Sequence, residues 1–212
     1  MSGKLNLVAA GFALTALTYG LARFAYGLML SHIRADLAMS AAAAGWIGGS
    51  AFAAYCLGIA ATLLAGTKVS PRLLAVLAGT IATAGLTLAA LADSALSLGV
   101  AMALAGLSTG LTSPPLATAV ARSLQGAPAA RANGAINSGT AAGIILSGAA
   151  LILFPGDWRS LYLLFASIGA LITLWLCFAM PAGSSADRTD QFPLKHLNRP
   201  AAAALSRWRI RT

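Results

Sequence analysis

The sequence predicts an all-α, polytopic membrane protein with six transmembrane helices. Apolar residues make up 58% of the 212 residues and charged residues only 9%, whereas a soluble domain carries about 25% charged residues. The mean hydropathy is +0.81. Six apolar segments are long enough for the roughly 20 residues that a helix needs to cross a bilayer, and polar or turn-forming segments separate them. One membrane domain, residues 1–180, accounts for this pattern.

Turn-forming residues divide the apolar sequence into its spans. Pro71 suits the first turn of the third span, because proline has no amide hydrogen and amide hydrogens in the first turn of a helix find no partner within the helix. Asp93 and Ser94 mark the next turn, and Gly126 and Pro128 the one after the fourth span. The expected spans are residues 5–30, 42–65, 71–92, 96–121, 132–154 and 159–180, and residues 181–212 form a basic tail with no segment able to cross a bilayer.

The first span contains one full charge, Arg23, between Tyr19 and Tyr26. On a regular helix Thr15, Tyr19, Arg23 and Tyr26 form one stripe, because residues three and four apart share a face. A guanidinium at membrane depth costs roughly 2.5–3.5 kcal/mol on insertion scales, so it needs protein, a polar cavity or the headgroups beside it. Two interpretations stay open: Arg23 meets an anionic group or a partner helix, or it is structural and reaches the interface or the carbonyls of a kinked helix.

Basic residues are distributed unevenly between the two sides of the expected bundle. Eleven of them fall on one side, against two on the other, which also holds three aspartates. Because basic loops stay in the cytoplasm, this pattern predicts an even number of spans and two cytoplasmic chain ends. The eleven are Lys4, Lys68, Arg72, Arg122, Arg131, Arg188, Lys195, Arg199, Arg207, Arg209 and Arg211; the opposite side holds Arg34, Arg159, Asp36, Asp93 and Asp157.

Small residues are spread through the spans, including 22 glycines in the chain. In lipid no hydrophobic force draws helices together, so small residues that let backbones approach take over that role. The spacings Gly139-x-x-x-Gly143 and Gly45-x-x-Gly48-Gly49 fit this use, and we expect them at helix crossings.

The fourth and fifth spans carry further polar groups. Pro114 and Pro115 free two backbone carbonyls within the fourth span, and Ser108 and Thr112 share one face of it. Asn137 lies on a polar face of the fifth span. Adhesion between helices is one interpretation of these groups. The lining of a solute path is the other.

A hydrolase pattern in the fourth span is better explained as part of a helix. Gly106-x-Ser108-x-Gly110 matches the nucleophile elbow, which requires a strand-turn-helix context. The two histidines, His32 and His196, fall in a loop and in the tail, where neither is placed to act as a base. We therefore expect no enzyme activity, no metal site and no cofactor.

A family resemblance rests on residues 21–27 (LARFAYG), 33–37 (IRADL), Ser40 and 44–46 (AGW). Together they resemble the start of major facilitator superfamily transporters, and in particular of the bacterial YbfB/YjiJ branch, which is grouped with sugar and drug efflux permeases. The Asp157-Trp158-Arg159 entry to the last span is similar to a habit of the superfamily. The resemblance covers residues 5–180.

The sequence departs from the superfamily's pattern in three places. The loop between the second and third spans keeps Gly66 and Arg72 but lacks the usual Asp-Arg pair. Met102 stands where the fourth span commonly carries an arginine, and the fifth span lacks the proline of the antiporter motif. Charge-relay gating by this loop and proton coupling through that arginine are therefore not expected.

The resemblance implies secondary transport of a small solute by an inner-membrane permease or efflux protein. Such transporters have twelve spans in two halves with the solute site between them, and this chain corresponds to the N-terminal half. It is expected to be a truncated product or a half that pairs with a second copy or another chain. The expected partners are the bilayer and the solute, and no nucleic acid. The path candidates are Arg23, Tyr19, Tyr26, Ser108, Thr112 and Asn137. The alternative function is a non-transporting membrane scaffold.

Overall fold

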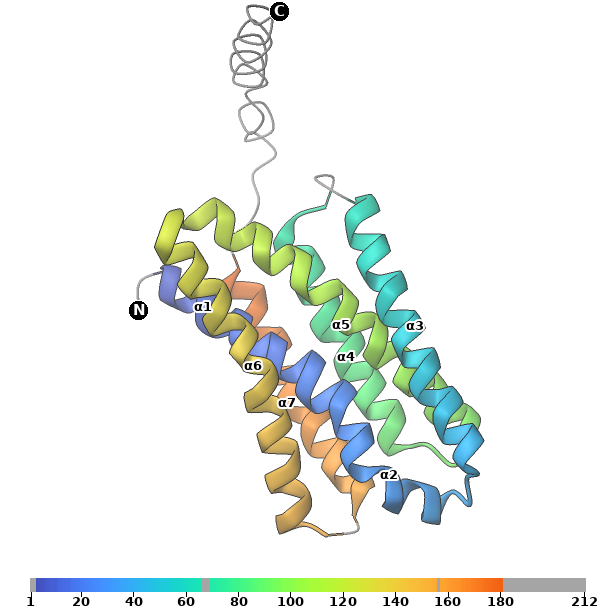
Figure 1. Cartoon of the computed structure of the whole chain (residues 1–212). Coiled ribbons are helices and arrows are strands. Elements are labelled where there is room, and N and C mark those ends of the chain that lie inside the picture. Colours follow the sequence, from blue (N-terminus) through green and yellow to red (C-terminus); the bar gives the residue numbers. More distant parts are fainter. Residues whose placement is uncertain (1–2, 66–68, 156, 181–212) are drawn as a thin grey trace, which may run out of the picture. The chain divides into compact units, whose positions relative to one another are not determined.

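In the computed structural model, residues 3–65, 69–155 and 157–180 are described; the expected basic tail, residues 181–212, lies outside them. Every regular element in these ranges is helical, and six helices are long and apolar enough to cross a membrane, which confirms the predicted fold class. The elements, drawn in Figure 1, are α1 (Gly3–Thr15), η1 (Ala16–Phe24), α2 (Ala25–Asp36), α3 (Ala41–Ala65), α4 (Pro71–Ala90), α5 (Ala95–Ser123), α6 (Gly126–Leu153) and α7 (Trp158–Ala179).

Side-chain caps mark where α4, α5 and α7 begin. The Ser70 hydroxyl accepts a hydrogen bond from the amide of Leu73 at 3.2 Å, and Pro71 follows as the first helical residue of α4. Ser94 and Ser97 cap α5 reciprocally. The Asp157 carboxylate accepts from the amide of Ser160 at 3.0 Å at the start of α7.

The first transmembrane helix is continuous from Gly3 to Asp36, over 34 residues, and so runs on beyond residue 30. Its middle part, η1, is a π-helix: the Ala25 amide after it donates to the carbonyl of Gly20, five residues back. π-helical segments widen the helix and are frequent at functional sites. The widening also disturbs the regular stripe expected of this span. Thr15 and Tyr26 are buried, whereas Tyr19 and Arg23 are half-buried.

Four helix-helix contacts account for most of the packing. In Figure 1, α6 runs beside α1 and η1, while α3 lies along α5. α4 packs between α5 and α7. Each pair crosses at glycines: a Cβ at Gly58 of α3 would lie 2.6 Å from the Leu107 carbonyl of α5, and one at Gly169 of α7 would lie 2.7 Å from the Thr83 hydroxyl of α4.

The two glycine patterns singled out in the sequence differ in their surroundings. A Cβ at Gly139 would collide with the backbone of Phe12, and one at Gly143 with the backbone of Ala16, so both glycines let α6 touch the first helix. By contrast, a Cβ at Gly45 or Gly49 of α3 would meet no atom within 4 Å. The packing expectation for the α3 glycines is therefore wrong within the described part of the chain, because they lie on an exposed face.

An ion pair joins the ends of α2 and α7. The Arg159 guanidinium pairs with the Asp36 carboxylate and also donates to the carbonyl oxygen of Ala92 at 2.9 Å. Its Cζ lies 4.2 Å from the centroid of the Trp158 ring, which is itself buried. Arg159 thus connects α2, α7 and the residues just after α4, at the end of the bundle that carries Asp36, Asp93 and Asp157.

Candidate functional site

Arg23 lies among aromatic rings on an open face of the first helix. Its Cζ is 4.6 Å from the centroid of Tyr55, 5.3 Å from that of Phe52 and 5.5 Å from that of Phe24. Phe24 neighbours it on the same helix, and the other two rings come from α3. At 1.5 Å per residue, Arg23 lies roughly 20 Å along the helix from Asp36 and roughly 30 Å from Gly3. Arg23 is therefore far enough from both ends of this helix to fall within the stretch that a hydrocarbon core of about 30 Å would cover.

A hydrogen-bonded hydroxyl pair adjoins these rings. The Tyr19 and Ser113 hydroxyls are 2.8 Å apart, which joins η1 to α5. The Tyr19 ring also meets Tyr55 edge-on, with centroids 6.4 Å apart. Tyr55 therefore contacts both the charge and the hydroxyl pair. We call this set the Arg23 cluster: Tyr19, Arg23, Phe24, Phe52, Tyr55 and Ser113.

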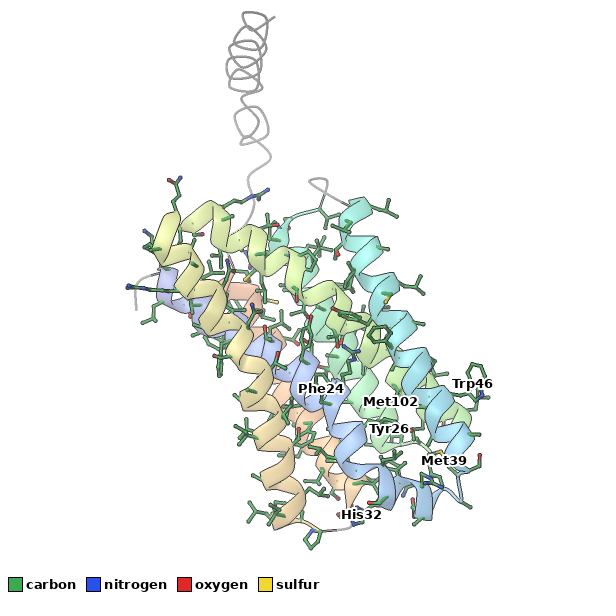
Figure 2. All side chains as sticks on the ribbon, viewed as in Figure 1. Phe24, Tyr26, His32, Met39, Trp46 and Met102 are labelled. Atoms are coloured by element: carbon green, nitrogen blue, oxygen red, sulfur yellow. The ribbon has the colours of Figure 1, made fainter. Side chains whose placement is uncertain are left out.

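The Arg23 cluster faces outward from the six helices. Phe52 is 55% exposed and Phe24 42% exposed, and Ser113 is also exposed. Figure 2 shows Phe24 on the first helix at mid-height, while Tyr26 lies nearer the end marked by His32. A cation and two hydroxyls at this depth are out of place against lipid tails, because nothing in the hydrocarbon can hydrogen-bond them.

Rings partly offset the cost of placing Arg23 in the membrane. Its insertion cost is roughly 2.5–3.5 kcal/mol, and a cation over an aromatic face gains about 0.5–2 kcal/mol. Among the described residues the one ion pair is Arg159–Asp36, and the described carboxylates all lie at the end of the bundle that carries Asp36, roughly 20 Å along the helix from Arg23. The guanidinium therefore keeps its attraction for an anion.

Three of the predicted path residues lie buried in helix contacts. Tyr26, 8% exposed, donates to the carbonyl of Ala44 at 3.1 Å and so ties α2 to α3. Ser108 donates to the Ala105 carbonyl of its own helix at 2.7 Å. Thr112 donates to the Thr18 hydroxyl at 3.1 Å. These hydroxyl groups bond to a neighbouring helix, as in Tyr26 and Thr112, or to their own helix, as in Ser108.

Asn137 lies on α6, away from the hydrogen bonds and ring contacts of the Arg23 cluster. Its side chain is exposed, and its neighbour Ile136 is buried against the first helix. Of the six sequence candidates, only Tyr19 and Arg23 belong to the Arg23 cluster.

Backbone carbonyls of the π-helix receive hydrogen bonds from neighbouring helices. The Thr109 hydroxyl of α5 reaches the carbonyl oxygen of Thr18 at 2.9 Å, as well as that of Ala105 in its own helix at 2.8 Å. The Ser147 hydroxyl of α6 lies 3.4 Å from the carbonyl of Gly20. Such partners satisfy backbone groups that a departure from α-helical bonding leaves available. They hold η1, and with it Tyr19 and Arg23, in place.

Sequence reasoning missed Phe52, Tyr55 and Ser113. Tyr55 had a usable signal, since it is a polar aromatic residue in the middle of an apolar span, with Phe52 three residues before it on the same face. Ser113 stood next to the candidate Thr112, but successive residues on a helix point about 100° apart. Only the neighbouring helices decide which of the two is exposed.

A separate hollow lies between α4 and α7. Its volume is about 730 Å³. The hydroxyls of its threonines, including Thr80, Thr87 and Thr173, bond to carbonyls of their own helices at 2.7–2.9 Å. The hollow therefore presents mainly methyl groups and aliphatic side chains, which suit lipid tails better than a polar solute.

Comparisons with known proteins agree with this architecture. No curated protein matches the chain. The family model of the Major Facilitator Superfamily matches residues 12–210, which is nearly the whole chain and includes all of η1 and α3. Members of this superfamily are secondary transporters embedded in membranes. The chain therefore belongs to the Major Facilitator Superfamily.

Proposed function

We propose that the chain takes part in secondary transport of a small solute and that the Arg23 cluster lines the solute's path. The observation that carries this proposal is a half-buried guanidinium, well inside the length of a membrane-spanning helix, that contacts three aromatic rings, two of which, Phe24 and Phe52, are exposed. Polar groups on a helix face inside the membrane mark solute pathways more often than lipid contacts. Tyr26, Ser108 and Thr112 support the path by fixing the helices, and Asn137 is kept as an outlying candidate.

The open face also supports a half-transporter. In this superfamily the solute site lies between two six-helix halves, so the Arg23 cluster would face a second such unit, from a second copy or another chain. Gly45 and Gly49, with open space beside them on α3, would let a helix of that unit approach closely. A truncated product would present the same face uncovered.

Orientation and location complete the proposal. One end of the bundle carries four described basic residues. They are Lys4 where α1 begins, Arg72 where α4 begins, Arg122 where α5 ends and Arg131 near the start of α6. By the positive-inside rule that end would be cytoplasmic, in the inner membrane of a bacterium. The motif at residues 21–27 supports membership of the YbfB/YjiJ branch.

Flux measurements test the proposed function. The full chain would be reconstituted in liposomes and assayed with a panel of radiolabelled organic anions, neutral sugars and organic cations. We expect flux of at least one class above that of empty liposomes, and its loss in Arg23→Ala. Arg122→Ala is the matched control, since it removes an exposed cation at a helix end. Absence of flux for every class, or equal flux in Arg23→Ala, would contradict the proposal.

A further inference from the structure

We infer that the solute held by the Arg23 cluster is a small organic monoanion with a flat apolar body, such as an aromatic carboxylate. The inference rests on the proposed function and adds the chemical class of the solute. It follows from three features of the cluster: one positive charge, its aromatic surroundings and the hydroxyl pair beside them.

The charge of the solute follows from the distribution of charged residues. Arg23 is the one described cation far from a helix end; Lys4, Arg34, Arg72, Arg122, Arg131 and Arg159 all lie within about two turns of one. The described carboxylates lie at the end of the bundle that carries Arg159. A single negative charge would therefore neutralise the site, whereas a dianion would leave one charge uncompensated in a medium of low dielectric.

The geometry of Arg23 favours a planar anion. A guanidinium is flat, stacks on aromatic faces and carries its N–H donors around its edge. With its Cζ 4.6 Å from the Tyr55 centroid, the side chain has ring contacts to hold it in place, while its edge remains suited to the two oxygens of a carboxylate.

The rest of the solute would contact rings and hydroxyls. The Phe52 and Phe24 rings are 55% and 42% exposed, so each offers surface against which an apolar or aromatic body packs. The hydroxyl oxygens of Tyr19 and Ser113 are 2.8 Å apart. One of the two hydroxyl hydrogens forms the bond between them, and the other is not used in that bond. That hydrogen is available to a polar substituent or to a carboxylate oxygen.

Three probes of matched shape and different charge test the inference. Binding of benzoate, benzamide and benzylamine to the purified full chain would be measured by titration calorimetry at neutral pH. We expect benzoate to bind at least about tenfold more tightly than benzamide, which corresponds to 1.4 kcal/mol. Benzylamine should bind most weakly, because its ammonium group would meet Arg23.

Variants at Arg23 separate its charge from general effects. In Arg23→Gln the preference for benzoate over benzamide should fall to within about twofold. Arg23→Lys should keep part of the preference, since it keeps the charge but loses the planar fork. Arg122→Gln removes a charge elsewhere and should leave the preference unchanged. The melting temperature of each variant without ligand shows that it is folded.

The inference is overturned if the folded protein binds none of the probes, if benzamide or benzylamine binds as tightly as benzoate, or if Arg23→Gln keeps the preference. The proposed function fails separately. A chain that binds benzoate through Arg23 but moves no solute in liposomes refutes transport alone, while one that moves solutes without preferring anions refutes the solute class alone.

Discussion

The close crossing of α6 over the first helix gives a sharp prediction for Gly143→Ala. A Cβ at this position would lie 2.8 Å from the Cα of Gly20 and 3.0 Å from the carbonyl carbon of Ala16. These are backbone atoms, so no side chain can turn aside and the helices must separate. Overpacking of this kind costs about 1–3 kcal/mol.

Gly148→Ala is the matched control on the same helix. A Cβ there would meet no atom within 4 Å, yet both substitutions gain the same roughly 0.5–1 kcal/mol from replacing glycine by alanine in a helix. The difference between the two variants therefore isolates the packing cost. At about 2–4 °C per kcal/mol for a chain of this size, Gly143→Ala should melt roughly 2–12 °C below Gly148→Ala.

Thermal unfolding of the purified protein in detergent, followed by tryptophan emission, measures this difference. Gly134→Ala, which also has open space at its Cβ, is a second control and should behave like Gly148→Ala. If Gly143→Ala melts together with the two controls, the α6 crossing is not as close as described and the reasoning about small-residue packing fails.

Two further predictions concern single hydrogen bonds. Thr109→Val removes the hydroxyl that donates to the Thr18 carbonyl, and it should lower stability by about 0.6 kcal/mol, a typical value for a hydrogen bond between helices in membranes. Thr118→Val is the control and should change the melting temperature less, because the Thr118 hydroxyl is exposed and bonds within its own helix. Equal shifts in melting temperature would contradict the cross-helix role of Thr109. Hydrogen bonds from Ser160 hold the pKa of Asp157 below its ordinary value of 3.8, so the cap of α7 stabilises the fold above pH 3.8 and loses this effect as the pH falls through the lower folded pKa. The difference in melting temperature between the unaltered protein and Asp157→Ala should therefore shrink with acidification. A difference that grows as the pH falls would refute this account.

The architecture was predictable because the bilayer dictates it. A helix must satisfy its own backbone and cover the hydrocarbon thickness, so apolar length and turn residues such as Pro71 and Asp93 were sufficient to find six helices. The longer extent of the first helix was harder to see, because the residues from Ser31 to Asp36 are polar enough to look like a loop.

The site was only partly predictable, for reasons that lie in neighbouring helices. In η1, Gly20 touches Gly143 of α6 and the Thr18 carbonyl accepts a hydrogen bond from Thr109 of α5, and no pattern within the first span reveals those contacts. Arg23 and Tyr19 carried a signal because charge and hydroxyl are rare at membrane depth. Thr112 and Ser113 carried the same signal, and packing alone decides that Ser113 is the exposed one.

Solvent access at Ser113 tests most directly whether the Arg23 cluster faces a water-filled path. In a background with Cys56 and Cys177 replaced by serine, Ser113→Cys would be treated in liposomes with a membrane-impermeant, charged thiol reagent. Leu174→Cys is the control, because Leu174 is 60% exposed on α7 beside the apolar hollow. We predict rapid labelling of Ser113→Cys and none of Leu174→Cys. A Ser113→Cys variant as unreactive as the control would place this face against lipid and contradict the transport path.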